Sequence, residues 1–193
     1  AAPQLLEIFP DSFFVHVLRD GRDVLASHRD VEKRLAASGQ DSYHHANFNR
    51  RRICGRWNRA VSIHRELRAD RELDGRVIEV RFEDLLIEPA KVLEQLFASL
   101  SLELEAATLN PEKLPARHGG IAPDGYWTTE EQLRQPFDPD KIQRWQHSLP
   151  LTDRVLANLF MAGPLQRLGY PVSPFYVHAH RTLAVLRKRQ PSN

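Results

Sequence analysis

A dense apolar run at residues 12–18 (S-F-F-V-H-V-L) is the feature of this sequence that most constrains its fold. The run shows little alternation between apolar and polar residues, which is typical of a strand buried on both faces in a parallel sheet. Arg19-Asp20-Gly21 ends the run, and a helical pattern follows at once. Asp20 or Asp23 is expected to cap that helix, because a carboxylate complements its positive N-terminal end. A strand that leads directly into a helix favours an α/β fold.

The rest of the pattern predicts one more strand and several helices. Residues 76–82 (R-V-I-E-V-R-F) indicate the second strand, and helices are expected at about 49–70, at 89–100 and at 151–168. The order strand, helix, helix, strand, helix implies a parallel α/β layer with a crossover connection. Residues 101–139 are rich in Pro and Gly and are expected to form loops.

The charge of the 193 residues is nearly balanced, with 27 Lys and Arg against 25 Asp and Glu, but the basic residues are unevenly spread. Residues 44–68 hold seven arginines and a single acid, Glu66. The arginines are Arg50, Arg51, Arg52, Arg56, Arg59, Arg65 and Arg68. This stretch indicates either an anionic partner at one face or a solvated helix face paired with acids elsewhere. The single cysteine excludes an internal disulfide, and no apolar run approaches the roughly 20 residues of a membrane-spanning helix.

Arg19 directly follows the first predicted strand, at the place where open α/β sheets bind ligands. Its guanidinium offers a fork of donors suited to phosphate. The hydroxyl of Ser27, near the second turn of the next helix, can donate to a phosphate oxygen, and the N-terminal end of that helix also favours an anion. From the residues alone, two interpretations stay open. One is an anion site at Arg19 and Ser27, and the other is a surface network of the arginines and aspartates of residues 19–23 around a helix cap.

Several other conspicuous residues have structural interpretations. Trp57 and Trp145 are expected to be packing anchors, and Glu83-Asp84 is expected to cap the helix after the second strand. Cys54 is expected to be a small packing residue, and a neighbouring arginine would lower the pKa of its thiol.

Residues 19–27 (R-D-G-R-D-V-L-A-S) resemble the 3′-phosphate-binding segment of sulfotransferases, the enzymes that use 3′-phosphoadenosine-5′-phosphosulfate (PAPS). The family pattern places an Arg at a strand end and a Ser eight residues later, as Arg19 and Ser27 are here. Four more segments are similar to family elements in the same order: the helix around Trp57, residues 80–85 (V-R-F-E-D-L) with Pro89, residues 141–145 (K-I-Q-R-W) and residues 168–170 (L-G-Y). The L-G-Y segment is similar to one seen in bacterial and tyrosylprotein sulfotransferases. Together the five segments extend the resemblance over nearly the whole chain.

The resemblance implies a role for each of five residues. Arg19 and Ser27 would bind the 3′-phosphate, and Arg144 would lie near the phosphates. Phe82 stands where relatives carry a Tyr beside the adenine, and a Phe packs on a ring but lacks the hydroxyl hydrogen bond. Thr129 would be a polar contact in a loop that covers the nucleotide. The implied fold is an α/β domain over residues 1–193, with a P-loop-NTPase-like parallel sheet flanked by helices.

The resemblance also implies that part of the family's site is missing. No segment resembles G-x-P-[RK]-S-G-T-T, which binds the 5′-phosphosulfate and precedes the 3′-phosphate segment, usually with the catalytic base between them. Only eighteen residues precede Arg19. We therefore expect a C-terminal portion without the N-terminal strand, loop and helix, with an exposed strand edge, no catalytic residue and no activity alone.

The implied function is transfer of a sulfuryl group from PAPS, the co-substrate, to a hydroxyl or amine, without a metal. Such transfer depends on in-line positioning and charge stabilisation. The acceptor, a small molecule, glycan or peptide, stays open because variable loops shape its pocket. Two alternatives also stay open: a P-loop kinase-like nucleotide-binding enzyme, and a non-catalytic anion-binding module built on residues 49–68. Nucleic acid is not an expected partner, because the arginines lack interleaved aromatics. The expected location is the cytoplasm, with a Golgi lumen as the alternative.

Overall fold

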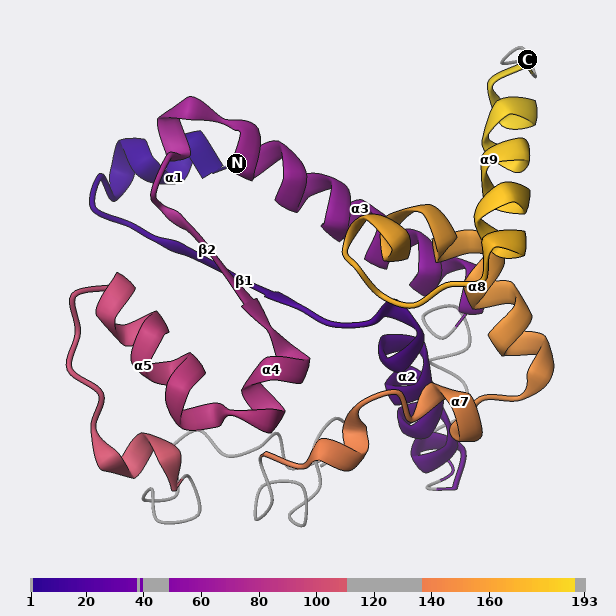
Figure 1. Ribbon diagram of the computed structural model, residues 1–193, viewed down its shortest axis with the longest axis horizontal. Coiled ribbons are helices and arrows are strands. Elements are labelled where there is room, and N and C mark those ends of the chain that lie inside the picture. The colour runs from indigo at the N-terminus through magenta and orange to yellow at the C-terminus, as the bar shows by residue number, and fades with distance from the viewer. Residues whose placement is uncertain (1, 38, 40–48, 111–136, 190–193) are drawn as a thin grey trace. The chain divides into compact units, whose positions relative to one another are not determined.

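The structure, a computed structural model, describes residues 2–37, 39, 49–110 and 137–189, and is mostly helical (Figure 1). Its elements are α1 (Ala2–Ile8), β1 (Phe14–Leu18), α2 (Gly21–Ala37), α3 (Arg50–Ala69), η2 (Arg71–Leu73), β2 (Val77–Arg81), α4 (Phe82–Ile87), α5 (Pro89–Ser99), η3 (Ala106–Leu109), η5 (Pro139–Lys141), α7 (Trp145–Ser148), α8 (Leu151–Arg167) and α9 (Pro174–Arg189), where η marks a 3₁₀ helix. Both predicted strands and the predicted helices at 49–70, 89–100 and 151–168 are confirmed to within a few residues.

The described residues group into two compact units, each built from two stretches of the chain. Unit 1 comprises Ala1–Arg19 and His64–Ile142. Unit 2 comprises Asp20–Ile63 and Gln143–Asn193. Helix α3 therefore contributes its residues up to Ile63 to unit 2 and the rest to unit 1.

Unit 1 contains the sheet, in which β1 and β2 run parallel (Figure 1). The register pairs Phe14 with Val77 at one end and Leu18 with Arg81 at the other. The parallel pairing with helical crossover confirms the α/β prediction. In the described residues the sheet has these two strands, so the larger P-loop-NTPase-like sheet stays a prediction.

The expectation that β1 is buried on both faces is wrong. Val15 and Val17 are 44% and 53% exposed, whereas Leu18 is buried. Side chains of a strand alternate between faces, so one face of β1 is open while the face that carries Leu18 is covered. The apolar run is indeed a strand, but in the described residues the elements of unit 1 cover mainly one of its sides.

A histidine pair attaches the end of α3 to the covered face of the sheet. The rings of His16 and His64 stack with their centres 4.4 Å apart, and Nε2 of His64 lies 2.8 Å from Oε2 of Glu79. His16 and Glu79 are themselves paired across the two strands. Burial, together with the nearby His64, lowers the pKa of His16. Stacking of the two rings is compatible with this, because a neutral imidazole avoids like-charge repulsion at such close range.

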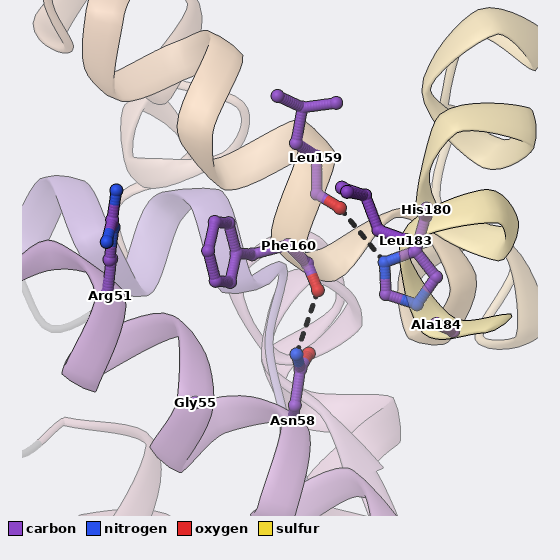
Figure 2. A pocket seen from close by; sticks show the side chains of 8 residues that line it. All are labelled: Arg51, Gly55, Asn58, Leu159, Phe160, His180, Leu183 and Ala184. Atoms are coloured by element: carbon purple, nitrogen blue, oxygen red, sulfur yellow. Dashed lines mark hydrogen bonds between the residues drawn. The ribbon is translucent and has the colours of Figure 1, made fainter. Parts of the chain in front are cut away.

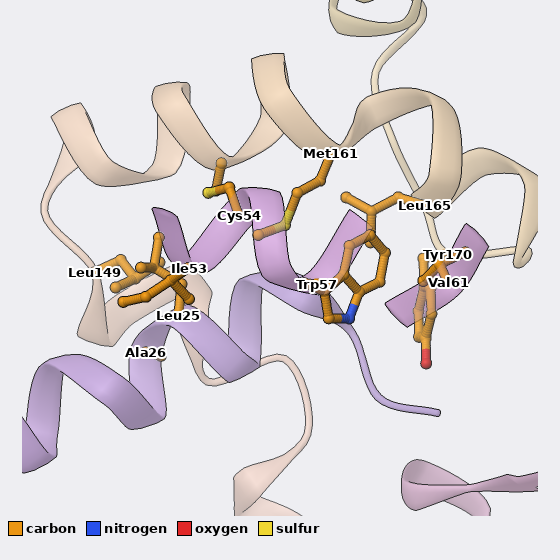
Figure 3. Packing of buried hydrophobic residues seen from close by; sticks show 11 residues of the cluster. Leu25, Ala26, Ile53, Cys54, Trp57, Val61, Leu149, Met161, Leu165 and Tyr170 are labelled. Carbon is orange, nitrogen blue, oxygen red and sulfur yellow. The ribbon is translucent and has the colours of Figure 1, made fainter. Parts of the chain in front are cut away.

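Unit 2 is organised around one hydrophobic cluster (Figure 3). The cluster consists of Leu25, Ala26, Ile53, Cys54, Trp57, Val61, Leu149, Ala157, Met161, Leu165 and Tyr170. These residues come from α2, α3, α8 and the segments that flank α8. Helix α3 contributes Ile53, Cys54, Trp57 and Val61. Trp57 is 8% exposed, which confirms it as a packing anchor.

Helix α2 begins against this cluster, and its first residue must be a glycine. A Cβ atom at Gly21 would lie 2.5 Å from Sδ of Met161 and 2.6 Å from Cδ2 of Trp57. Such distances require the core to shift. Gly21→Ala is therefore expected to lower the free energy of unfolding by about 1–3 kcal/mol, the usual cost of overpacking a core.

Urea denaturation followed by circular dichroism measures this change, and Gly55→Ala is the matched control. Among the residues that the structure describes, a Cβ at Gly55 meets nothing within 4 Å. Because alanine is the better residue inside a helix, that variant is expected to gain about 0.5–1 kcal/mol. Equal effects of the two substitutions would contradict the packing argument.

Cys54 is fully buried in the cluster and confirmed as a packing residue, but its thiol is not activated. Burial, with a smaller contribution from the carboxylate of Asp153, raises its pKa to about 12. The expectation of a pKa lowered by a neighbouring arginine is therefore wrong, because desolvation of the thiolate outweighs any such attraction.

The thiol of Cys54 is expected to react with 5,5′-dithiobis(2-nitrobenzoate) at pH 8 only as fast as the protein unfolds, since the thiolate is the reactive form. The reaction is followed by absorbance in native buffer and in urea. Labelling of the native protein at the rate of a free thiol would contradict this assignment.

Candidate functional site: an arginine on an aromatic ring at the strand ends

Arg19 and Phe82 meet in unit 1, where the two parallel strands end. The register places Leu18 opposite Arg81, so the next residues along the two strands are Arg19 and Phe82. The guanidinium carbon of Arg19 lies 4.3 Å from the centre of the Phe82 ring. Nη2 of Arg19 also donates a hydrogen bond to the carbonyl oxygen of Lys141, at 3.3 Å. Two of the five predicted site residues are thus in contact.

This contact positions the arginine side chain. A cation over an aromatic face is held by the ring's quadrupole, and the carbonyl of Lys141 at the end of η5 restrains one nitrogen. Arg19 is only partly exposed, so its charge is less screened than on an open surface. The pair brings a forked cation and a planar ring together, which suits a ligand that has both an anionic group and an aromatic base.

Helix α4 begins at Phe82 itself, directly after β2. Glu83 and Asp84 lie in its first turn. The cap position itself is Arg81, and no side chain makes a cap hydrogen bond there, so the expectation that Glu83-Asp84 caps this helix is wrong. The two carboxylates only complement the positive end of the helix from its first turn. Phe82 is therefore held between the strand and the helix, which limits the directions its ring can take.

The second half of R-D-G-R-D is buried in unit 2 and is not a surface network. Arg22 is 1% exposed. Its Nε and Nη2 donate to the two carboxylate oxygens of Asp20, at 3.0 and 2.7 Å. Its Nη1 donates to Oδ1 of Asn158 at 3.2 Å and to the carbonyl oxygen of Pro171 at 2.9 Å. The guanidinium also lies 4.1 Å from the centre of a Trp145 ring.

The carboxylates of Asp20 and Asp23 form hydrogen bonds that hold the start of α2 in unit 2. Oδ1 of Asp20 accepts from the backbone N–H of Arg22 at 2.8 Å, so Asp20 is the helix cap. The carboxylate of Asp23 accepts from the backbone N–H groups of Gln143 and Trp145, both at 2.9 Å. Two carboxylates therefore already lie at the N-terminal end of α2.

The segment that precedes and begins α7 is thus the partner of the R-D-G-R-D segment, 120 and 122 residues away in sequence. The sequence showed that residues 19–27 and 141–145 each resemble an element of the same family, but not that the two segments contact each other. Two features of the sequence could have indicated this contact: the second Arg-Asp pair, Arg22-Asp23, after Gly21, and Trp145 in the later segment. Trp145 is confirmed as a packing anchor, with Arg22 on its ring.

Ser27 and Arg144 both lie in unit 2. Ser27 is half-buried on α2, one turn after Asp23. Arg144 forms an ion pair with Asp30, three residues beyond Ser27 on the same helix. Residues three apart share a helix face, so Arg144 is bound along the stretch of α2 that carries Ser27. Thr129 lies outside the described residues.

The described residues contain no group of three or more His, Cys, Asp or Glu side chains placed to hold a metal ion. In the same part of the chain, no helix combines the length and the apolar character needed to cross a membrane.

Comparison with known proteins matches residues 1–106 to the model of the sulfotransferase family. Protein-tyrosine sulfotransferase 1 of Danio rerio is 27% identical over 169 residues, which are 86% of this chain and 44% of that protein. Protein-tyrosine sulfotransferase of Drosophila melanogaster is 24% identical, over 86% of this chain and 32% of its own length. Protein-tyrosine sulfotransferase A of Caenorhabditis elegans is 24% identical, over 88% and 42%. The chain thus spans less than half the length of these relatives, and, since the family match covers more than half of the chain, it belongs to the sulfotransferase family.

Proposed function

We propose that this chain forms the 3′-phosphate-binding part of a PAPS-dependent sulfotransferase. The observation that carries the proposal is the stacking of Arg19 on Phe82 at the carboxyl ends of the two parallel strands. That is where α/β folds of this kind bind nucleotides. Membership in the sulfotransferase family supports sulfuryl transfer as the reaction.

In this proposal Arg19 and Ser27 bind the 3′-phosphate, and Phe82 packs beside the adenine. The fork of Arg19 supplies charge-assisted hydrogen bonds, and Ser27 supplies a hydroxyl donor. Arg144 acts near the phosphates only if it leaves Asp30, its partner here. Thr129 keeps the expected role of a polar contact from the covering loop.

The reaction moves a sulfuryl group from PAPS to a hydroxyl or amine. The bond between sulfur and the bridging phosphate oxygen breaks while the acceptor oxygen or nitrogen bonds to sulfur, and the acceptor proton passes to a base. We assign no residue of this chain as that base. Arg19 and Ser27 would contribute by fixing the nucleotide so that the acceptor can attack in line.

For the acceptor we propose a tyrosine in a peptide, because three relatives are named protein-tyrosine sulfotransferases. Small molecules and glycans are the alternatives. The excess of arginines over acids in residues 44–68 favours an acceptor with negative charge around the reacting group.

We further infer a single P-loop-NTPase-like domain that includes both units. The family match, residues 1–106, contains the first stretch of unit 2 and residues of both stretches of unit 1, which supports treating them as parts of one domain. For location we propose the cytoplasm, where a buried, unpaired Cys54 stays reduced, with a Golgi lumen as the alternative.

Isothermal titration calorimetry of the full-length gene product tests the proposal. Adenosine 3′,5′-bisphosphate is compared with adenosine 5′-monophosphate, which lacks the 3′-phosphate. We expect the bisphosphate to bind at least about tenfold more tightly, since hydrogen bonds to a charged group contribute about 1.5–3 kcal/mol. Equal affinities would contradict the proposed site. Tight binding of ATP with magnesium would instead favour the kinase-like alternative.

A further inference from the structure

Unit 2 contains a pocket of about 300 Å³ between α3, α8 and α9 (Figure 2). It is lined by Arg51, Gly55, Asn58, Leu159, Phe160, His180, Leu183 and Ala184. Two hydrogen bonds hold its walls: Nδ2 of Asn58 donates to the carbonyl oxygen of Phe160, and Nδ1 of His180 donates to that of Leu159, both at 2.9 Å. Asn58 and His180 are therefore held in place, and the volume is at the small end of the size range of ligand sites.

Gly55 indicates that this pocket is kept open. A glycine inside a helix costs stability and usually has a packing reason. Two other glycines of unit 2 have one, because a Cβ at Gly21 would strike Trp57 and Met161, and a Cβ at Gly163 would lie 2.9 Å from the His180 ring. A Cβ at Gly55 would meet nothing within 4 Å. None of the described residues therefore requires this glycine, whereas a molecule seated in the pocket would.

The lining defines the chemistry of that molecule. Among the described residues, Arg51 is the one Arg, Lys, Asp or Glu that lines the pocket, and it is exposed. Leu159, Phe160, Leu183 and Ala184 provide apolar surface, and Leu183 is 42% exposed although apolar. One cation beside an apolar hollow suits a small ligand with one negative group and an apolar body.

We propose that this pocket binds a small organic monocarboxylate, with its carboxylate on Arg51 and its aliphatic or aryl body against Leu159, Phe160 and Leu183. The site belongs wholly to unit 2 and does not use Arg19 or Phe82. The proposal is therefore independent of the nucleotide site, and adenosine bisphosphate binding serves as a separate readout of the latter.

The test is titration of the full-length gene product with sodium octanoate, followed by calorimetry and by the methyl NMR signals of Leu159, Leu183 and Ala184. Octylammonium chloride is the matched probe of opposite charge. We expect saturable octanoate binding that shifts these methyl signals, and at least about tenfold weaker binding of octylammonium, since a charge-assisted hydrogen bond is lost. Equal binding of the two probes, or shifts spread over the whole protein, would overturn the proposal.

Two variants locate the site. Arg51→Gln is expected to weaken octanoate binding at least about tenfold. Arg59→Gln, an exposed arginine on the same helix outside the pocket, is expected to leave the octanoate affinity unchanged. Gly55→Leu is expected to abolish binding by filling the pocket, and a thermal melt by circular dichroism checks that it folds. Octanoate affinity unchanged in Arg51→Gln, or in a folded Gly55→Leu, would overturn the proposal.

Discussion

Arg22→Ala is expected to lower the free energy of unfolding by about 3–5 kcal/mol, the usual cost of removing one member of a buried ion pair. Arg22 is 1% exposed, and its guanidinium donates to Asp20, to Asn158 and to the carbonyl oxygen of Pro171. Alanine would leave the carboxylate of Asp20 buried without its cation. It would also leave two acceptors without this donor and remove the cation from the ring of Trp145.

Urea denaturation at pH 7 measures this loss, with Arg59→Ala as the control. Arg59 is exposed on α3, so its replacement is expected to change the free energy by no more than about 0.5 kcal/mol. Arg22→Lys keeps the charge but not the fork of donors, and we expect an intermediate loss. A loss below about 1 kcal/mol for Arg22→Ala would show that the network contributes little.

A double-mutant cycle separates the pair from its surroundings. If the Arg22–Asp20 pair is the main cause, combining Asp20→Ala with Arg22→Ala will cost clearly less than the two single changes together. Additive losses would instead assign the stability to Asn158, Pro171 and Trp145.

Arg19→Ala is expected to weaken binding of adenosine 3′,5′-bisphosphate by about 10–100-fold, because a phosphate loses charge-assisted hydrogen bonds. This expectation rests on the proposed function. The affinity for adenosine 5′-monophosphate should change little, since that nucleotide has no 3′-phosphate. Arg19→Ala should therefore reduce the ratio of the affinity for the bisphosphate to the affinity for the monophosphate.

Calorimetry at two salt concentrations tests whether the loss of nucleotide affinity comes from the charge of Arg19. The loss in Arg19→Ala should shrink as ionic strength rises, because salt screens a partly exposed charge. Arg68→Ala is the control, since the Arg68 side chain is 56% exposed and lies 3.9 Å from Glu79. Phe82→Leu should weaken both nucleotides alike by removing the ring. A parallel loss for both nucleotides in Arg19→Ala would contradict the assignment of the 3′-phosphate to Arg19.

The sequence predicted those strands and helices that depend on neighbouring residues. The strand at residues 14–18 and the helix that opens at Pro89 follow from apolar runs, turn residues and periodicity. The placement of Arg19 beside Phe82 also follows, because parallel strands of equal register end together. The contact between Arg19 and Phe82 in the candidate site could therefore be predicted from the sequence.

Two of the predictions that were wrong concern burial. Val15 and Val17 are apolar yet exposed, and the thiol of Cys54 is deactivated by its surroundings. Neither result depends on the residue alone, because burial is a property of what packs on the side chain. Residues 19–23 show the same point, since arginines and aspartates are usually exposed but here Asp20, Arg22 and Asp23 are buried.

By itself, the sequence determined the strands and helices, the arginine at the end of β1 and the resemblance to one enzyme family, since these depend on neighbouring residues and their order. Only the tertiary structure decided that Arg22 joins Asp20 to Asn158 and Pro171, which lie 136 and 149 residues away. It alone also showed that Gly55 lines a pocket whereas Gly21 is needed for packing. The physical reason is that hydrogen bonds and close packing act over a few ångströms, and which distant residues come within that range is decided by the packed chain.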